Sequence, residues 1–347
     1  MKAAVLFSPG DLRVVDVPVP EVNDREVLVK VGSVGVCGSD IPRVMTKGAH
    51  HMPITIGHEF SGEIAKVGKG VNGWKEGDRV TVAPLMPCFK CYWCQHGKFG
   101  LCEDYDYFGS RTNGALAEYV KVPATNLVRV PSNLSFEEAA MSDPAATALH
   151  TLERGKLGLQ DTVAVYGVGP IGFFIIEWAR ILGLKQVIAV DVFEEKLELA
   201  KKIGATVLIN AKKVDPVEAI MDVTDGFGAQ MVIEAAGLET TQLQSILSTR
   251  KHGYAVFLGI SYEKLDLPPK AVDQIMRKEL YVTGSWNSNS LPFPGHEWQL
   301  AVDYMANKYL DAKTLISHRY RLEDAPQVFQ KLIQRDFAFN KVVFNLQ

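Results

Sequence analysis

The feature that most constrains the fold is a glycine-rich turn, Gly167-Val168-Gly169-Pro170-Ile171-Gly172, between an apolar run and a helical pattern. In such a turn the first glycine permits a tight bend and the second lets a pyrophosphate approach the backbone. The third glycine lets the helix pack closely on the strand. The helix N-terminus, which includes Pro170 and Ile171, then offers free N–H groups and a positive dipole to phosphates. The turn therefore predicts a dinucleotide-binding site.

The sequence around this turn alternates between short apolar runs and helical patterns. The apolar runs are Thr162–Tyr166, Gln186–Val190, Thr206–Ile209, Gln230–Ile233, Tyr254–Leu258 and Leu280–Thr283. Helical patterns such as Ile171–Leu182 and Glu194–Ile203 lie between them. This alternation is typical of an α/β fold with a parallel sheet covered on both faces. Six such strands predict a doubly wound Rossmann domain.

An acidic residue at the end of the second predicted strand indicates which cofactor binds. Asp191 follows the glycine turn by about 20 residues, where a carboxylate binds the ribose 2′-hydroxyl. That charge would repel a 2′-phosphate, and Val192 and Phe193 follow with no adjacent arginine to offset it. We therefore expect NAD rather than NADP. The alternative is a glycine turn without a ligand beside a solvated aspartate.

The chain of 347 residues is too long for one ordinary core, so we expect two domains. The first part contains short β patterns separated by Gly, Pro and Asp, at Lys2–Leu6, Glu26–Val34, Ser61–Val67, Asp78–Val82 and Ala117–Val122. A capping box at Ser135 and Glu138 opens a helix that Pro144 is expected to break or kink. The C-terminal part has a helical pattern, His296–Asn307, and β patterns at Ser317–Leu322 and Lys341–Asn345. We predict a β-rich domain made of residues 1–146 and 286–347 around a Rossmann domain of residues 147–285.

Five cysteines predict metal sites rather than disulfides, because their number is odd and four are clustered. The cluster consists of Cys88, Cys91, Cys94 and Cys102. Four thiolates saturate a tetrahedral zinc ion, so the segment 88–102 is predicted to be a structural zinc lobe. An iron–sulfur cluster is the alternative, but the spacing of the fourth cysteine differs from the ferredoxin pattern.

The remaining cysteine, Cys37, suggests a second metal site. Together with His58 and Glu59 it offers a thiolate, an imidazole and a carboxylate, a set that suits a catalytic zinc with one open position. The alternative is that Cys37 and His58 are ordinary buried residues.

Composition excludes some classes of partner. A formal net charge of −3 gives no basic field for nucleic acid or for a membrane surface. The N-terminus lacks the pattern of a secretory signal, and no uninterrupted apolar run is long enough to span a membrane. We expect a cytoplasmic protein.

These motifs together resemble the zinc-containing medium-chain dehydrogenases, the group of alcohol, sorbitol and threonine dehydrogenases. The resemblance covers nearly the whole chain. It implies a GroES-like catalytic domain split around the Rossmann domain, with the active site in the cleft, and a homodimer or homotetramer. It also implies that Cys37 and His58 bind the catalytic zinc and that Glu59 is a ligand or an immediate neighbour. Asp143 takes the place of a glutamate found in the polyol branch, so the resemblance implies that it reaches the metal, either directly or through water. Thr147 matches a position that packs on nicotinamide.

The resemblance further implies a proton relay that begins at Ser39. Many relatives have a histidine five residues after the cysteine ligand, whereas this chain has Pro42, which cannot carry protons. The outer relay must differ, with water or His50 as the candidates.

Several segments outside the general motifs resemble the branch that oxidises galactitol 1-phosphate to tagatose 6-phosphate. These segments are Cys37–Arg43, Gly48–His50, Pro53–Gly62, Gly109–Arg111, Gly284–Trp286 and Pro294–Trp298. They make Arg43, His50 and Arg111 candidates for holding a phosphate, since arginine suits phosphate, and Trp286 a candidate for the pocket wall. The alternatives are ordinary surface or ion-paired residues for the first three and a core residue for Trp286. Sorbitol, threonine or butanediol is the alternative substrate. The alternative from another functional class is a nucleotide-binding protein that is stabilised by zinc and has no catalytic activity.

Overall fold

The computed structural model describes residues 1–262, 264–334 and 339–347, and these form two compact units. Unit 1 comprises Met1–Ala146 and Ser288–Gln347, and unit 2 comprises Thr147–Asn287. The sequence predicted the return to the first unit at residue 286, whereas the structure has it at Ser288. Among the described residues, none of the helices is both long and apolar enough to cross a membrane.

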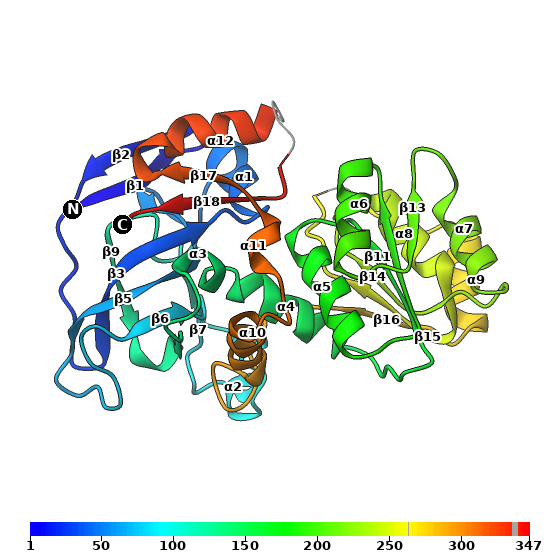
Figure 1. Ribbon diagram of the computed structural model, residues 1–347, viewed down its shortest axis with the longest axis horizontal. Helices are drawn as coiled ribbons and strands as arrows, with labels where there is room; N and C mark the ends of the chain where they lie inside the picture. Colours follow the sequence, from blue (N-terminus) through cyan, green and yellow to red (C-terminus); the bar gives the residue numbers. More distant parts are fainter. Residues whose placement is uncertain (263, 335–338) are drawn as a thin grey trace. The chain divides into compact units, whose positions relative to one another are not determined.

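Unit 2 is built on the predicted parallel sheet of six strands (Figure 1). The strands are β11 (Thr162–Tyr166), β12 (Gln186–Asp191), β13 (Val207–Asn210), β14 (Ala229–Glu234), β15 (Thr249–Phe257) and β16 (Tyr281–Gly284). Their order is β13-β12-β11-β14-β15-β16, so the chain starts in the middle and winds outward in both directions. This is the order of a doubly wound nucleotide-binding sheet, and it confirms the predicted fold class.

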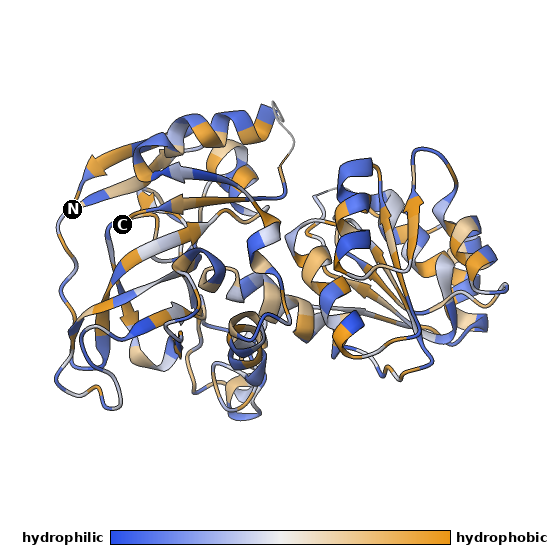
Figure 2. Ribbon diagram, in the orientation of Figure 1, coloured by the Kyte–Doolittle hydropathy of each residue, from blue (hydrophilic) through white to orange (hydrophobic). Residues whose placement is uncertain are grey.

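Helices cover both faces of that sheet. Helix α4 (Ser142–Leu152) leads into unit 2, and α5 (Pro170–Ile181) packs on α6 (Glu194–Ile203). The helices α7 (Pro216–Val223), α8 (Glu239–Ser248) and α9 (Pro269–Arg277) form a second row. Because both faces are covered, the central strands such as β11 and β14 are largely apolar and buried, and the strands of this sheet are mostly orange in Figure 2.

Unit 1 contains a sheet of seven strands, a sheet of three and a small sheet of two. The large sheet has the order β10-β6-β5-β3-β18-β17, with β9 paired to β3. Its strands are β3 (Glu26–Gly35), β5 (Glu59–Val67), β6 (Arg79–Val82), β9 (Tyr119–Pro123), β10 (Leu127–Arg129), β17 (Ile316–Arg321) and β18 (Lys341–Asn345). The other strands are β1 (Lys2–Ser8), β2 (Asp11–Asp16), β4 (Ile54–Thr55), β7 (Leu85–Met86) and β8 (Asp106–Tyr107). Apolar side chains from both ends of the chain, such as Val31 and Phe344, share one core.

The helices of unit 1 are short. They are α1 (Asp40–Pro42), α2 (Tyr92–Gln95), α3 (Phe136–Ala139), α10 (His296–Ala306), α11 (Ala312–Leu315) and α12 (Ala325–Gln334). Shorter helical turns are η1 (Arg43–Lys47), η2 (Phe99–Leu101), η3 (Ala124–Asn126) and η4 (Leu322–Asp324). The predicted capping box is present, because the Ser135 hydroxyl accepts the Glu138 N–H at 3.2 Å and the Glu138 carboxylate accepts the Ser135 N–H at 3.1 Å. The helix ends at Ala139, before Pro144, which lies in the first turn of the next helix, α4.

The C-terminal strand returns to the centre of the first sheet. Strand β18 pairs antiparallel with β3, which in turn pairs with β5. In this register Gly35 lies opposite both Val343 and Glu59. Residues from three distant parts of the sequence therefore meet at the end of β3, where the first candidate site is formed.

Candidate active site and metal centres

The structure brings the three predicted catalytic-zinc residues of unit 1 together. Cys37 follows the end of β3, and His58 and Glu59 lie at the start of β5. One potential ligand atom from each lies within 4.8 Å of the others. His58 and Glu59 are buried, and Cys37 is half-buried. Antiparallel pairing of β3 with β5 produces this grouping, since it places Gly35 opposite Glu59, and Cys37 and His58 lie next to these ends of the two strands.

A buried carboxylate supports the histidine. Asp40 is 1% exposed and accepts the Cys37 N–H at 3.1 Å. Its Oδ1 lies 3.2 Å from His58 Nδ1 and also pairs with the Arg43 guanidinium. Burial raises the pKa of Asp40, but His58, Arg43 and the Cys37 N–H lower it to about 2. Asp40 therefore stays ionised, with its Oδ1 at ion-pair distance from His58 Nδ1, although Nδ1 forms no hydrogen bond among the described residues.

A buried lysine holds the glutamate. Lys341 lies at the start of β18, and its ammonium forms an ion pair with Glu59 Oε2. Both side chains are almost completely buried. A side chain could not be added at Gly35, since its Cβ would lie 2.5 Å from Glu59 Oε2 and 3.0 Å from Lys341 Cε. The ion pair occupies Oε2, and Oε1 is not part of it.

Two further polar side chains lie around these residues. Burial raises the pKa of Asp143 to about 7, with His58 opposing the increase and Glu59 adding to it. Tyr107 contacts the His58 ring edge-on, with the ring centroids 5.5 Å apart. Burial raises the pKa of Tyr107 well above its usual range, and the nearby carboxylate of Asp143 adds to the increase. Asp143 is thus near the cluster but does not belong to the group of ligand atoms that includes Glu59.

The chemistry of this donor set fits zinc. A thiolate, an imidazole and a carboxylate that converge in a buried site are the ligands of a catalytic zinc ion with an open position. The support of His58 by Asp40 is the arrangement that orients metal-binding imidazoles.

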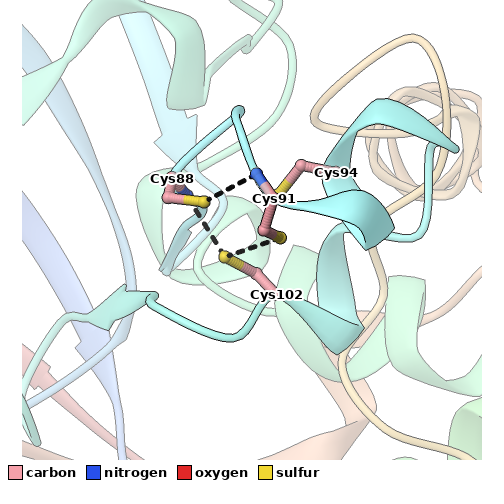
Figure 3. A group of neighbouring side chains, drawn as sticks. All are labelled: Cys88, Cys91, Cys94 and Cys102. Carbon is pink, nitrogen blue, oxygen red and sulfur yellow. Dashed lines mark hydrogen bonds between the residues drawn. The ribbon is translucent and has the colours of Figure 1, made fainter.

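The four clustered cysteines also converge, in a lobe next to β7 and β8 (Figure 3). Their sulfur atoms lie within 4.8 Å of one another. Backbone N–H groups point at the sulfurs, from Cys88 to Cys102 Sγ at 3.2 Å and from Cys91 to Cys88 Sγ at 3.4 Å. Hydrogen bonds from the Cys94 and Glu103 backbone lower the pKa of Cys91 to about 6, whereas burial raises the pKa values of Cys94 and Cys102. Such N–H groups stabilise thiolates, and four thiolates at these separations fit a closed tetrahedral zinc site.

The predicted phosphate-binding residues lie on two neighbouring loops of unit 1. The His50 N–H donates to Ser110 O at 3.1 Å, and His51 Nε2 lies 2.7 Å from Arg111 O. Burial lowers the pKa of His50, and the positive charges of Arg111, Arg43 and His51 lower it further. The loop of His50 and His51 therefore lies beside the loop of Ser110 and Arg111. The charge of Arg43 also acts on the His50 ring.

The glycine turn in unit 2 has the predicted geometry. Gly167 has φ +92°, and a Cβ on Gly172 would lie 2.2 Å from Gly167 O. Both positions therefore require glycine. Gly169 is the N-cap of α5, and a Cβ there would meet no atom within 4 Å. The open space at Gly169, in front of free helix N–H groups, fits a pyrophosphate.

Asp191 joins the end of β12 to this turn. Its Oδ2 accepts the Val168 N–H at 2.8 Å, and its Oδ1 accepts the N–H groups of Val192 at 2.7 Å and Phe193 at 3.1 Å. A carboxylate has about four acceptor positions, so at least one is left for a ribose hydroxyl. Thr147 is half-buried at the start of unit 2 on α4, and Trp286 is 51% exposed on the loop after β16.

Sequence reasoning missed Asp40, Tyr107 and Lys341. A signal existed for Asp40, because it lies three residues after Cys37 in the same short turn. The sequence gave no signal for Lys341, since more than 280 residues separate it from Glu59 and only strand pairing brings the two together.

Two family profiles match most of the chain. "Alcohol dehydrogenase GroES-like domain" matches residues 23–132, and "Zinc-binding dehydrogenase" matches residues 170–307. Galactitol 1-phosphate 5-dehydrogenase of Escherichia coli K12 is 36% identical over 98% of this chain and 97% of its own length. Sorbitol dehydrogenase of Bacillus subtilis is 32% identical over 96% of this chain and 94% of its own length. D-arabitol-phosphate dehydrogenase of Enterococcus avium is also 32% identical, over 96% of this chain and 95% of its own length.

Solved structures show the same similarity. Galactitol-1-phosphate dehydrogenase from Escherichia coli matches with a TM-score of 0.94 at 36% identity, over 99% of this chain and all of that one. A zinc-binding dehydrogenase from Sinorhizobium meliloti bound to NADP matches with a TM-score of 0.90 at 32% identity, over 99% and 98%. An alcohol dehydrogenase from Escherichia coli CFT073 in complex with NADH matches with a TM-score of 0.90 at 28% identity. The match covers 100% of this chain and 99% of that one. The chain therefore belongs to the family of zinc-dependent medium-chain alcohol and polyol dehydrogenases, which are oxidoreductases.

Proposed function

We propose that the protein is an NAD-linked dehydrogenase of a polyol phosphate, with galactitol 1-phosphate as the preferred substrate and tagatose 6-phosphate as the product. The observation that carries the proposal is that the positive charges of Arg43 and Arg111 act on His50 in the unit that contains Cys37 and His58. A neutral polyol requires no such charges. Two relatives that act on polyol phosphates support the same substrate class.

Among these residues we assign the phosphate to Arg111. The Arg43 guanidinium is already paired with Asp40, which supports His58, so Arg43 belongs to the metal site. Arg111 lies over the Tyr105 ring at 4.6 Å, and among the described residues it has no carboxylate partner. A guanidinium that is held by a ring and free of acids suits bidentate binding of phosphate. His50 is the second donor, because a bound phosphate would restore its proton.

We assign the catalytic zinc to Cys37, His58 and Glu59, and the structural zinc to Cys88, Cys91, Cys94 and Cys102. Glu59 is preferred to Asp143 because its ligand atom belongs to the converging group. Asp143, whose pKa is near 7, is then a neighbour that reaches the metal through water. We also propose that the enzyme is a homodimer or a homotetramer.

When bound, zinc held by Cys37, His58 and Glu59 would supply a Lewis acid for the substrate hydroxyl, and a nicotinamide would supply the hydride acceptor. The proton of that hydroxyl passes to Ser39, whose own hydroxyl forms no hydrogen bond among the described residues. Pro42 on α1 has no donor, so the next carrier is water or His50. The pyrophosphate is held by the glycine turn, that is, by Gly167, Gly169, Pro170, Ile171 and Gly172. Asp191 binds the ribose, and Thr147 packs on the nicotinamide.

Steady-state kinetics with phosphorylated and plain polyols test this proposal. Wild-type enzyme should show a much larger kcat/KM for galactitol 1-phosphate than for galactitol. Loss of one charge-assisted contact costs about 1.5–3 kcal/mol, so Arg111→Met should lower kcat/KM for the phosphate by about 10- to 100-fold. The value for galactitol should not change, because galactitol has no phosphate to lose.

Arg13→Gln is the matched control. Arg13 also lies over an aromatic ring, that of Phe7 at 5.0 Å, but it is paired with Asp11 on β2. Its loss should affect neither substrate. Equal kcat/KM for galactitol and its phosphate in the wild type would refute the polyol-phosphate assignment and would favour a plain substrate such as sorbitol.

A further inference from the structure

One side chain of unit 1, Tyr107, contacts both the four-cysteine lobe and the predicted catalytic-zinc residues. Tyr107 ends strand β8 and lies opposite Leu85 of β7. Its ring meets the His58 imidazole edge-on, with the ring centroids 5.5 Å apart and an angle of 61° between the planes. The same side chain packs against the small apolar core of the lobe, which consists of Leu85, Cys94, Phe99 and Cys102. Tyr107 therefore lies between the two sets of metal-binding side chains.

The backbone around Tyr107 is fixed independently of its side chain. The Tyr107 carbonyl accepts the N–H groups of Arg111 at 3.0 Å and Thr112 at 3.1 Å. The next residue, Phe108, is buried in the large core of unit 1, and its ring centroid lies 5.6 Å from that of Phe60 on β5. Because Phe60 follows His58 by two residues, two neighbouring ring contacts hold the segment 107–108 against the start of β5. A substitution at Tyr107 changes one of these contacts and keeps the backbone hydrogen bonds.

The orientation of the His58 ring depends on this packing. Asp40 Oδ1 lies 3.2 Å from His58 Nδ1, but Nδ1 forms no hydrogen bond among the described residues. The edge-on contact with Tyr107 therefore restricts rotation of the imidazole. Groups that surround a metal ligand set its orientation and, through it, the affinity for the metal.

The lobe can restrain Tyr107 only when the lobe itself is ordered. Two of its four thiol groups, those of Cys94 and Cys102, belong to the core on which Tyr107 packs. The segment 88–102 contains little regular structure, namely helix α2 of four residues and turn η2 of three. A structural metal supplies folding free energy to such a segment. A metal ion held by the four cysteines would therefore stiffen the surface that supports Tyr107.

We propose that Tyr107 is a positioning residue through which metal binding at the four-cysteine lobe strengthens metal binding by Cys37, His58 and Glu59. The inference rests on the two proposed metal sites. The coupling is reciprocal, because a gain in affinity at one site must appear equally at the other. The lobe thus supports the catalytic site as well as its own segment.

Binding of Co²⁺ to full-length, metal-free protein tests the role of Tyr107 without catalysis. One equivalent of Zn²⁺ first fills the four-thiolate site, and Co²⁺ is then titrated into the second site. The absorption band between the Cys37 thiolate and Co²⁺ gives the Kd. Tyr107→Leu should raise this Kd by about 10-fold or more, as expected for loss of a group that orients a metal ligand. Tyr107→Phe keeps the ring and should have nearly the wild-type Kd.

Phe293→Leu is the matched control. Phe293 is half-buried like Tyr107 and packs against the same lobe core, with its ring centroid 5.1 Å from that of Phe99. Among the described residues it has no ring contact with His58, so its loss should leave the Kd for Co²⁺ nearly unchanged. Equal increases in Tyr107→Leu and Phe293→Leu would show a general loosening of the lobe and overturn the proposal. A Tyr107→Phe protein that binds Co²⁺ as weakly as Tyr107→Leu would overturn it too.

The double variant Cys94→Ser/Cys102→Ser tests the coupling, because it removes both buried thiol groups of the lobe. It should raise the Kd of the second site by about 10-fold when Tyr107 is present and add little in the Tyr107→Leu protein. Effects that add in full would overturn the role of Tyr107 in the coupling. The Tyr107 and Phe293 variants retain all four cysteines, so their result decides the proposal even if the double variant does not fold.

Wild-type protein separates this proposal from the metal assignment on which it rests. Wild type that shows no thiolate-to-Co²⁺ band after the lobe is filled would refute the proposed catalytic metal site. Wild type and Tyr107→Leu proteins that bind Co²⁺ equally well would refute only the role of Tyr107.

Discussion

Replacing Lys341 by methionine should destabilise unit 1 strongly when no metal is bound. The Lys341 ammonium is 1% exposed and pairs with Glu59, which is 2% exposed. Lys341→Met keeps the length of the apolar stem and removes the charge. The space around the ammonium is small, because a Cβ added at Gly35 would lie 2.5 Å from Glu59 Oε2, 2.9 Å from Met141 Cε and 3.0 Å from Lys341 Cε. Glu59 would be left as a buried anion without its cation.

Removal of one partner from a buried ion pair costs about 3–5 kcal/mol. The matched control is Lys308→Met, which breaks an ion pair of 3.0 Å with Glu138 in which the lysine is 62% exposed. An exposed pair of this kind is worth about 1 kcal/mol or less. The double variant Lys341→Met/Glu59→Gln should recover part of the loss, since it removes the stranded charge as well.

Hydrogen exchange read by mass spectrometry can measure this loss in one unit at a time. Slowly exchanging amides of β3, β5 and β18 should exchange about 100-fold faster or more in zinc-free Lys341→Met, whereas those of β11 and β12 should not change. Zinc should reduce the difference, because a cation bound to Glu59 would replace the missing ammonium. A change below about 1 kcal/mol in zinc-free protein would refute the reasoning about the buried pair. A full loss that zinc does not reduce would argue against Glu59 as a ligand.

Three further outcomes are expected. Elemental analysis of metal-loaded protein should give two zinc ions per chain. The Cys102→Ser variant should lose one of them, because three thiolates do not complete the tetrahedral site. Finding iron with sulfide would contradict this prediction. Ser39→Ala should lower turnover by about 100-fold or more with NADH binding and zinc content unchanged, as expected for loss of a proton carrier; near wild-type turnover with hydride transfer rate-limiting would remove Ser39 from the relay. Burial raises the pKa of Glu138, but Ser135 and Lys308 lower it below the usual 4.5. Glu138 therefore stabilises the fold above about pH 4.5, and this effect is lost as the pH falls through its lower folded pKa. In Glu138→Gln the free energy of unfolding should thus fall less steeply between neutral and acid pH than in the wild type. An equally steep fall in both proteins would refute this.

Local sequence patterns determined much of the fold. The strand and helix periods predicted all six parallel strands of unit 2 to within a few residues, and the pattern Lys341–Asn345 is the observed strand β18. The glycine turn and the four-cysteine segment were also predictable, because their residues are close in sequence and each one meets a local requirement. At Gly172, for example, that requirement is the 2.2 Å approach of Gly167 O.

Tertiary structure decided the contacts between distant segments. Pairing of β18 with β3, and of β3 with β5, brings Lys341 to Glu59 and occupies one carboxylate oxygen. The end of β13 brings Lys212 to Phe193 beside Asp191, although the sequence around Asp191 showed no adjacent arginine. In both cases the charge near a carboxylate is set by strand register over long sequence separations. A single sequence shows which residues carry charge, but only the sheet order shows which of them meet.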